Sequence, residues 1–153
     1  MRSYNATMLA LIQRVIEAKV TVDGETVGEI GPGLLALVGI QPGDGTAQVA
    51  RMRERLLGYR VFDDEAGRMN QSLLQSGGGL LLVSQFTLVA DTSSGMRPGF
   101  STAAAPVEAE RIFGELVAAC REILPAGVET GRFGAHMVVS LANDGPATFL
   151  LQA

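Results

Sequence analysis

Two short apolar runs, residues 34–40 and 80–88, constrain the fold of this chain most strongly. The first reads LLALVGI, and a nearly continuous apolar run of this length is typical of a strand that is covered on both faces. The second reads LLLVSQFTL and is the strongest strand signal in the chain. Glycine-rich turns, at residues 31–33 and 77–79, precede the two runs. We therefore expect two buried strands in a strand-rich domain.

Further strands are expected before these runs. Residues 9–15 and 19–22 suit strands, and residues 26–30 suit a return strand. Between them, Asp23-Gly24 is a strong signal for a hairpin turn. The N-terminal part of the domain is thus expected to be an antiparallel hairpin.

Two other regions complete the strand pattern. Residues 59–62 can form a short strand before a turn at residues 63–67. Near the C-terminus, apolar residues alternate on one face of an expected strand, and a last apolar strand ends near Leu151. The alternating residues are Phe133, Ala135, Met137, Val139 and Leu141.

Two segments have helical periodicity. The first helix is expected to begin at Thr46, a candidate N-cap, and to end at Gly58. The second is expected from Pro106, which suits a first helical turn, to Leu124, because Pro125 cannot continue a helix. The expected buried faces are Val49, Met52, Leu56 and Leu57 in the first helix and Ala109, Ile112, Phe113, Leu116, Cys120 and Ile123 in the second.

Together these elements predict a single α/β domain with a strand-rich sheet and two helices. A length of 153 residues fits one domain, which we assign to residues 8–153. Residues 1–7 are polar and precede a second methionine, so we expect a flexible N-terminal extension. Hydrophobic residues make up 47% of the chain. Because a small domain buries a smaller share of its surface than a large one, this apolar surplus favours a subunit interface.

Charge and cysteine content limit the partners. The formal net charge is −4 and the basic residues are scattered, which argues against a duplex-binding face and against DNA as a partner. An RNA ligand would touch the protein through few phosphates. No stretch has the length of a membrane span or the pattern of a signal peptide. Cys120 is the only cysteine, so no intramolecular disulfide can form, and we expect a cytoplasmic protein.

Common catalytic groups give no obvious site. His136 is the only histidine and is expected at a surface or strand edge. Cys120 lies on the apolar face of a helix, where a thiolate is disfavoured. The acidic turn at residues 63–65 lacks the ligand spacing of a calcium loop, and the glycines at 77–79 lack the ending of a phosphate-binding loop. No metal or cofactor is expected.

Two polar segments remain unexplained by packing. Ser84-Gln85-Phe86-Thr87 interrupts an apolar strand, and Asn143-Asp144-Gly145-Pro146-Ala147-Thr148 has the composition of a turn. Polar groups at the end of a core strand must find hydrogen-bond partners, and a ligand is one such partner. Each segment therefore has either a purely structural role or a role in binding.

These segments resemble signature sequences of the D-aminoacyl-tRNA deacylase family. Ser84-Gln85-Phe86-Thr87-Leu88 is followed by Ala90-Asp91, and Gly145-Pro146 lies inside the second polar segment. The resemblance covers essentially residue 8 to the C-terminus, and several separated motifs occur in the same order. Ala147 is a departure, since a bulkier valine is expected there. The supporting matches are Gln13-Arg14-Val15, Leu57-Gly58-Tyr59-Arg60, Gly95-Met96-Arg97-Pro98 and Gly131-Arg132-Phe133.

The resemblance implies a cytoplasmic homodimer with a barrel-like sheet and no cofactor. It implies hydrolysis of the ester that joins a D-amino acid, or glycine, to the 3′ end of tRNA. This ester is reactive and the neighbouring ribose 2′-hydroxyl can assist water, so the protein needs mainly to position the ester and stabilise the oxyanion. The resemblance implies that the catalytic segment is Ser84, Gln85, Phe86 and Thr87, with the backbone N–H groups of Phe86 and Thr87 as expected donors. The Thr87 hydroxyl as nucleophile is the alternative, although no base lies nearby in sequence.

The resemblance also implies how a D-amino acid is selected. Gly145-Pro146, joined by a cis peptide, is expected to enter the active site of the other subunit. There, main-chain carbonyls would hold the substrate amine and clash with an L side chain. Arg14 is expected to steady this motif, and Phe133 and Met137 to line the pocket.

Two other functions fit the same sequence. A non-catalytic module that binds tRNA 3′ ends would carry the same fold. A small-ester hydrolase would use a serine triad of Ser84, His136 and Asp91.

Overall fold

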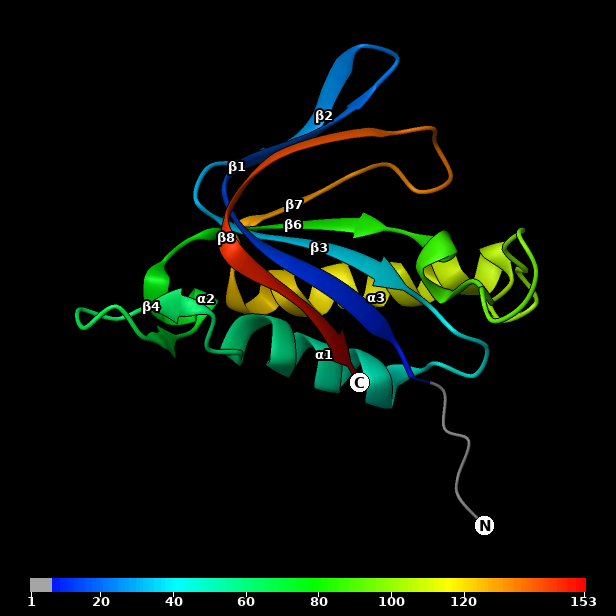
Figure 1. Cartoon of the computed structure of the whole chain (residues 1–153), viewed down its shortest axis with the longest axis horizontal. Coiled ribbons are helices and arrows are strands. Elements are labelled where there is room, and N and C mark those ends of the chain that lie inside the picture. The colour runs from blue at the N-terminus through cyan, green and yellow to red at the C-terminus, as the bar shows by residue number, and fades with distance from the viewer. Residues whose placement is uncertain (1–6) are drawn as a thin grey trace.

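The computed structural model describes residues 7–153 and shows one curved sheet with two long helices packed on one side (Figure 1). The N-terminal strand β1 (Leu9–Val22) forms a hairpin with β2 (Glu25–Ile30) through the Asp23-Gly24 turn. The expected extension, residues 1–7, lies outside the described residues except for Thr7. Two backbone hydrogen bonds, of 3.0 and 2.9 Å, join Met8 to Ala153.

The sheet contains six strands in the part of the chain that the structure describes. Its order is β2-β1-β3-β6-β7, and β8 (Val138–Gln152) pairs with β1 on its other edge, from Leu9 to Thr21. The two apolar runs form β3 (Gly33–Gly39) and β6 (Gly79–Ser84), which are parallel neighbours. The short strand β7 (Val128–Thr130) pairs with β6.

The sheet is nearly closed. A Cβ atom built on Gly28 of β2 would lie 2.2 Å from the carbonyl oxygen of Thr130 in β7, so the two end strands approach each other closely. Glycine is required at this position because any side chain would collide with backbone. The expectation of a barrel-like sheet is confirmed.

Two cores fill the two faces of this sheet. Leu34 and Leu82 pack toward the helices, whereas Leu35, Leu81 and Val83 pack inside the curve of the sheet. Successive side chains of a strand point to opposite faces, so a strand with a core on each side must be apolar throughout. This confirms that residues 34–40 are covered on both faces.

The long helices, α1 (Thr46–Gly58) and α3 (Pro106–Ile123), pack on the outer face of the sheet. All four expected apolar residues of α1 are buried. Its N-cap is Gly45, one residue before the expected Thr46. In α3 the expected face is buried except for Ile123, which is 46% exposed at the C-terminal end of the helix. Val117, which was not expected, is also buried on this helix.

The expectation of two helices is wrong. A short third helix, α2 (Leu73–Ser76), lies between β5 (Met69–Gln71) and β6. Ser72 accepts a hydrogen bond from the Gln75 N–H at 3.2 Å, and the Gln75 side chain accepts one from the Ser72 N–H at 2.8 Å. This capping box supports a helix too short to show apolar periodicity.

Several strand boundaries also differ from expectation. The segments 9–15 and 19–22 form one strand, and the expected strand 59–62 is replaced by a hairpin of β4 (Phe62–Asp63) and β5. The expected strand 80–88 ends at Ser84 and turns into a 3₁₀ helix, η1 (Phe86–Val89). Residues 133–137 form a turn, so the alternation from Phe133 to Met137 does not reflect a strand.

No helix within residues 7–153 has both the length and the apolar character needed to cross a membrane.

Candidate active site

A cavity of about 520 Å³ opens beside η1. This volume is in the range of sites for small ligands, about 300–1,000 Å³. Its wall combines the end of β6, η1, the start of α3 and the turn before β8. Five of its lining residues were expected from the sequence: Ser84, Gln85, Phe86, Phe133 and Met137.

The end of β6 presents a short turn of backbone to this cavity. The Gln85 N–H donates to the Val38 carbonyl at 2.8 Å and so fixes the chain to β3. The Gln85 side-chain amide then donates to the Thr87 hydroxyl. In residues 7–153, the N–H groups of Phe86 and Thr87 have no acceptor, as is usual for the first N–H groups of a helix. This turn therefore has two adjacent donors available for a ligand.

Aromatic residues form one side of the opening. The rings of Phe86 and Phe100 lie 5.3 Å apart at an angle of 57°, and both are exposed. Phe133 lies deeper, with its ring 6.5 Å from that of Phe113 in α3. The Ala104 N–H donates to the Ile40 carbonyl at 3.1 Å, which joins the segment carrying Phe100 to the end of β3.

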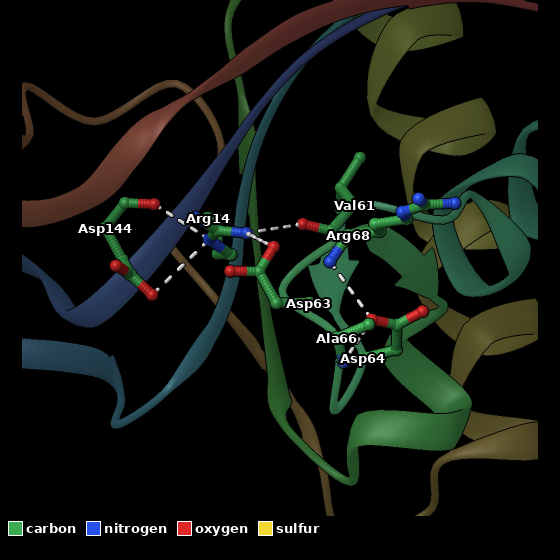
Figure 2. A network of polar contacts seen from close by, with 7 residues as sticks. All are labelled: Arg14, Val61, Asp63, Asp64, Ala66, Arg68 and Asp144. Carbon is green, nitrogen blue, oxygen red and sulfur yellow. Dashed lines mark hydrogen bonds and ion pairs between the residues drawn. The ribbon is translucent and has the colours of Figure 1, made fainter.

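The second polar segment lies elsewhere, opposite Arg14 (Figure 2). In the β1–β8 ladder Gln13 pairs with Thr148 and Val15 pairs with Asn143. One residue of β1, Arg14, therefore faces four residues of β8, 144–147. The extra residues bulge out of the ladder. They carry the exposed pair Gly145-Pro146, whose peptide bond is cis, as expected.

Arg14 holds both sides of this bulge. Its Nε donates to the Asp144 carbonyl at 2.8 Å, and its Nη1 donates to the Val61 carbonyl at 2.8 Å. Figure 2 shows the guanidinium between Asp144 on one side and Val61 and Asp63 on the other. The Asp63 and Asp144 carboxylates each lie 3.3 Å from it. The Asn143 side-chain amide donates to the Arg14 carbonyl at 2.9 Å, so side chains from both strands fix the bulge.

Within one chain the two signature segments are not brought together. None of Arg14, Gly145 and Pro146 lines the cavity beside η1. Ala147, the departure from the expected valine, is buried at the base of the bulge.

Other reactive groups are arranged without a conventional catalytic pair. Ser84 and His136 both line the cavity, but no hydrogen bond joins them in the described part of the chain. Asp91 accepts hydrogen bonds from the N–H and hydroxyl of Ser93, which lower the pKa of its carboxyl group. The three are therefore not linked as a triad. No cluster of three or more histidine, cysteine and acidic residues that could hold a metal occurs in residues 7–153.

Cys120 is fully buried on α3, as expected. Burial raises the pKa of its thiol to about 11, and the coulombic effect of Arg53 only partly opposes this. The thiol therefore stays protonated near neutral pH and is no nucleophile.

Comparison with known families decides between the possible assignments. Residues 11–152 match the family described as D-Tyr-tRNA(Tyr) deacylase. The chain belongs to this family. The expectation of a deacylase-family enzyme is thereby confirmed.

Members of the family from two bacteria are close in sequence. A D-aminoacyl-tRNA deacylase of Xanthomonas campestris pv. campestris (strain 8004) is 72% identical over 145 residues, 95% of this chain and 99% of the relative. One from Stenotrophomonas maltophilia (strain K279a) has the same identity and coverage.

Solved structures share the fold. A structure of the c-Myc DNA Unwinding Element Binding Protein is 36% identical, with a TM-score of 0.91 over 95% of this chain and 98% of that one. A probable eukaryotic D-amino acid tRNA deacylase is 15% identical, with a TM-score of 0.85 over 96% of this chain and all of that one, and shows likeness of fold.

The sequence did not predict several of the residues that line the cavity beside η1. Phe100, Ala104 and Pro106 reach it from an irregular segment and a helix start, where no periodic pattern indicates direction. His136 was expected at a surface, and it is exposed but lines the cavity. Its position next to Met137 was the available signal.

Proposed function

We propose that this protein hydrolyses the ester bond of D-aminoacyl-tRNA and releases free tRNA and the D-amino acid. The observation that carries this proposal is the cavity that Ser84, Gln85 and Phe86 help to line, next to Thr87, in a chain that belongs to the deacylase family. The turn at its wall has two backbone N–H groups without an acceptor, and within residues 7–153 no hydrogen bond links a nucleophile to a base there. Such a site suits a reactive ester better than a stable amide or phosphodiester.

Catalysis is proposed to rest on electrostatic stabilisation. The N–H groups of Phe86 and Thr87 would donate to the oxyanion that forms as water attacks the ester carbonyl. The 2′-hydroxyl of the terminal ribose would assist this water, so the substrate supplies part of the catalytic machinery. The Gln85 side chain donates to the Thr87 hydroxyl, which therefore serves to position the turn rather than to attack.

Chiral selection is proposed to use two copies of the chain. Gly145-Pro146 stands exposed on a bulge that Arg14 anchors, and the cavity of the same chain lacks it. In a homodimer this motif of one subunit would enter the cavity of the other. The main-chain carbonyls there would hold the substrate amine and exclude an L side chain.

Selection by main-chain atoms has consequences for specificity. Carbonyl groups do not depend on the identity of a D side chain, so a broad range of D-aminoacyl-tRNAs would be accepted. Glycine has no side chain to exclude, so glycyl-tRNA carried on alanine tRNA would also be hydrolysed. In a cell these activities would make the protein a chiral proofreading factor in translation.

A deacylation assay with matched substrates tests the proposed function. The purified protein should remove D-tyrosine from D-tyrosyl-tRNA in catalytic amounts and leave L-tyrosyl-tRNA charged. Loss of label from both substrates at the same rate would refute chiral selection. Binding of both without any hydrolysis would identify a non-catalytic tRNA 3′-end module instead.

A further inference from the structure

The loop that follows η1 carries Arg97 and leads directly into the cavity wall at Phe100. The N–H groups of Asp91 and Gly99 donate to each other's carbonyls, at 2.8 and 2.9 Å, and close a loop over residues 91–99. Every residue of this loop is exposed, and Met96 is 99% exposed. Figure 1 shows this segment, coloured green to yellow, beyond η1 at the start of α3. The loop is thus fixed at its base and projects its tip into solvent.

The base of this loop belongs to the cavity wall. Phe100 follows Gly99 directly, lines the cavity and packs against Phe86. The Thr102 hydroxyl donates to the Val89 carbonyl at the end of η1. A ligand that extends out of the cavity past these aromatic rings would therefore meet the loop tip, where Arg97 lies.

The charges around the cavity differ from those of the whole chain. The chain has 16 acidic and 12 basic residues. The two segments that supply most of the cavity wall, 84–104 and 131–137, contain two arginines, one carboxylate and the histidine. The carboxylate, Asp91, is occupied by the N–H and hydroxyl of Ser93. These two segments therefore carry a net positive charge in an acidic protein.

The side chains of Arg97 and Arg132, the arginines of these two segments, make no polar contact that supports the fold in the described residues. Both are exposed, and within residues 7–153 neither side chain has a hydrogen bond, an ion pair or a ring contact. By contrast, Arg14 and Arg111 are each held by two carboxylates. An exposed guanidinium without a partner is free to bind a phosphate through two parallel hydrogen bonds.

We propose that Arg97 and Arg132 bind phosphates of the tRNA 3′ end while its aminoacyl group occupies the cavity. This inference rests on the proposed function, because it takes the occupant of the cavity to be an aminoacyl ester. The phosphodiester chain must leave the cavity past its wall, and both arginines lie in segments that supply residues to that wall, three residues before Phe100 and directly before Phe133. Two such contacts also explain how an acidic protein without a basic face can hold RNA.

Two substrates separate phosphate binding from catalysis. One is D-tyrosyl-tRNA, and the other is D-tyrosyl-adenosine, which has the same ester but no phosphate. Arg97→Ala and Arg132→Ala should each lower kcat/KM for D-tyrosyl-tRNA by about tenfold, through KM, as expected for a lost charge-assisted contact. Both variants should hydrolyse D-tyrosyl-adenosine at the wild-type rate. For Arg97→Lys, kcat/KM for D-tyrosyl-tRNA should lie between those of the wild type and Arg97→Ala, because lysine keeps the charge but loses the paired donors.

Arg51→Ala is the matched control. Arg51 is also exposed and without a partner in the described part of the chain, but it lies on α1 and does not adjoin the cavity. Its variant should behave as the wild type with both substrates. Equal loss on both substrates for the Arg97 and Arg132 variants, or no loss on D-tyrosyl-tRNA for the double variant, would overturn the proposal.

Binding of uncharged tRNA decides the proposal even if no ester is hydrolysed. The dissociation constant is measured at several salt concentrations. Each removed phosphate contact should reduce the slope of log K against log salt by about 0.7, the value for single-stranded nucleic acid. A double variant with the wild-type affinity and slope would overturn phosphate binding. A wild type that binds tRNA with the expected slope but hydrolyses neither ester would refute only the proposed function.

Discussion

Arg14 Nε donates a 2.8 Å hydrogen bond to the main-chain carbonyl of Asp144, the residue before Gly145. The Arg14 side chain is only 10% exposed, and its other arm reaches the Val61 carbonyl. A buried guanidinium with several acceptors has little freedom to rotate. This contact therefore fixes the position of the Gly145-Pro146 bulge relative to β1 and the β4–β5 hairpin.

Arg14→Lys should separate charge from geometry at this position. A lysine keeps the charge but cannot donate in a planar fork to the Asp144 and Val61 carbonyls. We expect D-tyrosyl-tRNA deacylation to fall by roughly 10- to 100-fold, since small displacements of a positioning group are costly. Asp63→Asn is the control, because Asp63 is half exposed and its 3.3 Å contact should contribute little. A Lys variant with the full rate would show that the fork is not needed.

Gly145→Ala should damage activity with little effect on stability. A Cβ atom at this position would lie 2.3 Å from Asn143 Oδ1 and 3.0 Å from the Ala147 nitrogen. Asn143 cannot move freely because its amide is bonded to the Arg14 carbonyl. The bulge must then shift, and deacylation should fall by about 100-fold.

Gly114→Ala is the comparison for this variant. Its Cβ would meet nothing within 4 Å, and alanine is favoured over glycine inside a helix. The deacylation rate of the Gly114→Ala variant should equal that of the wild type, and its Tm should rise slightly. If Gly145→Ala were equally harmless, the bulge would have no role in the site.

His136→Ala tests the serine triad directly. His136 lines the cavity, yet in residues 7–153 it has no hydrogen bond to Ser84 or Asp91. Without a triad, its removal should change kcat for D-tyrosyl-tRNA by less than about tenfold, whereas loss of a true catalytic base costs about 10⁴-fold or more. A loss of the larger size would restore the triad and contradict backbone catalysis. Treatment with a serine-directed covalent reagent gives a second readout, and the wild type should stay active.

Asp44→Asn should stabilise the protein above about pH 6. Asp44 is 4% exposed, its Oδ1 has no partner in the described residues, and burial raises the pKa of its carboxyl group to about 6. The hydrogen bond from the Gln41 N–H opposes this rise only in part. The raised pKa means that the folded state binds this proton more tightly than the unfolded state does. Proton binding therefore contributes to folding stability at low pH, and this contribution is lost as pH rises through about 6.

The measurement is the free energy of unfolding at two pH values. At about pH 8 the asparagine variant should be more stable by about 2 kcal/mol, because it avoids burying a charge. At about pH 4 the difference should nearly vanish, since Asp44 is then largely neutral. A variant that is less stable at both pH values would show that the carboxylate is needed for folding.

The sequence predicted elements where the local pattern and the tertiary environment agree. The apolar faces of α1 and α3 follow helical spacing, and the Asp23-Gly24 turn carries its own conformational signal. The prediction from sequence was wrong where residues with high strand propensity do not form a strand. Phe86, Thr87 and Val89 all favour strands, yet they form η1, because the pairing of β6 with β3 ends at the bond from the Gln85 N–H to the Val38 carbonyl and no partner strand continues beyond it in the described residues.

The residues of the candidate site also fall into those that the sequence predicted and those that it did not. Ser84 and Met137 were found because a motif resemblance marks them. Phe100 and Ala104 were not found, because only the folded path of an irregular segment brings them to η1. The contact between Arg14 and Asp63 was also beyond reach, since it depends on how the β4–β5 hairpin sits against β1.

Complementation between two variants tests whether one subunit supplies the cavity and the other supplies Gly145-Pro146. Gly145→Ala disables the bulge, and Ala135→Trp fills the cavity, which Ala135 lines. Each homodimer should hydrolyse D-tyrosyl-tRNA at about 1% of the wild-type rate or less. A purified heterodimer of the two variants should regain about half of the wild-type rate, because a two-fold arrangement leaves one cavity facing one intact bulge. A heterodimer that forms but stays inactive would contradict the account.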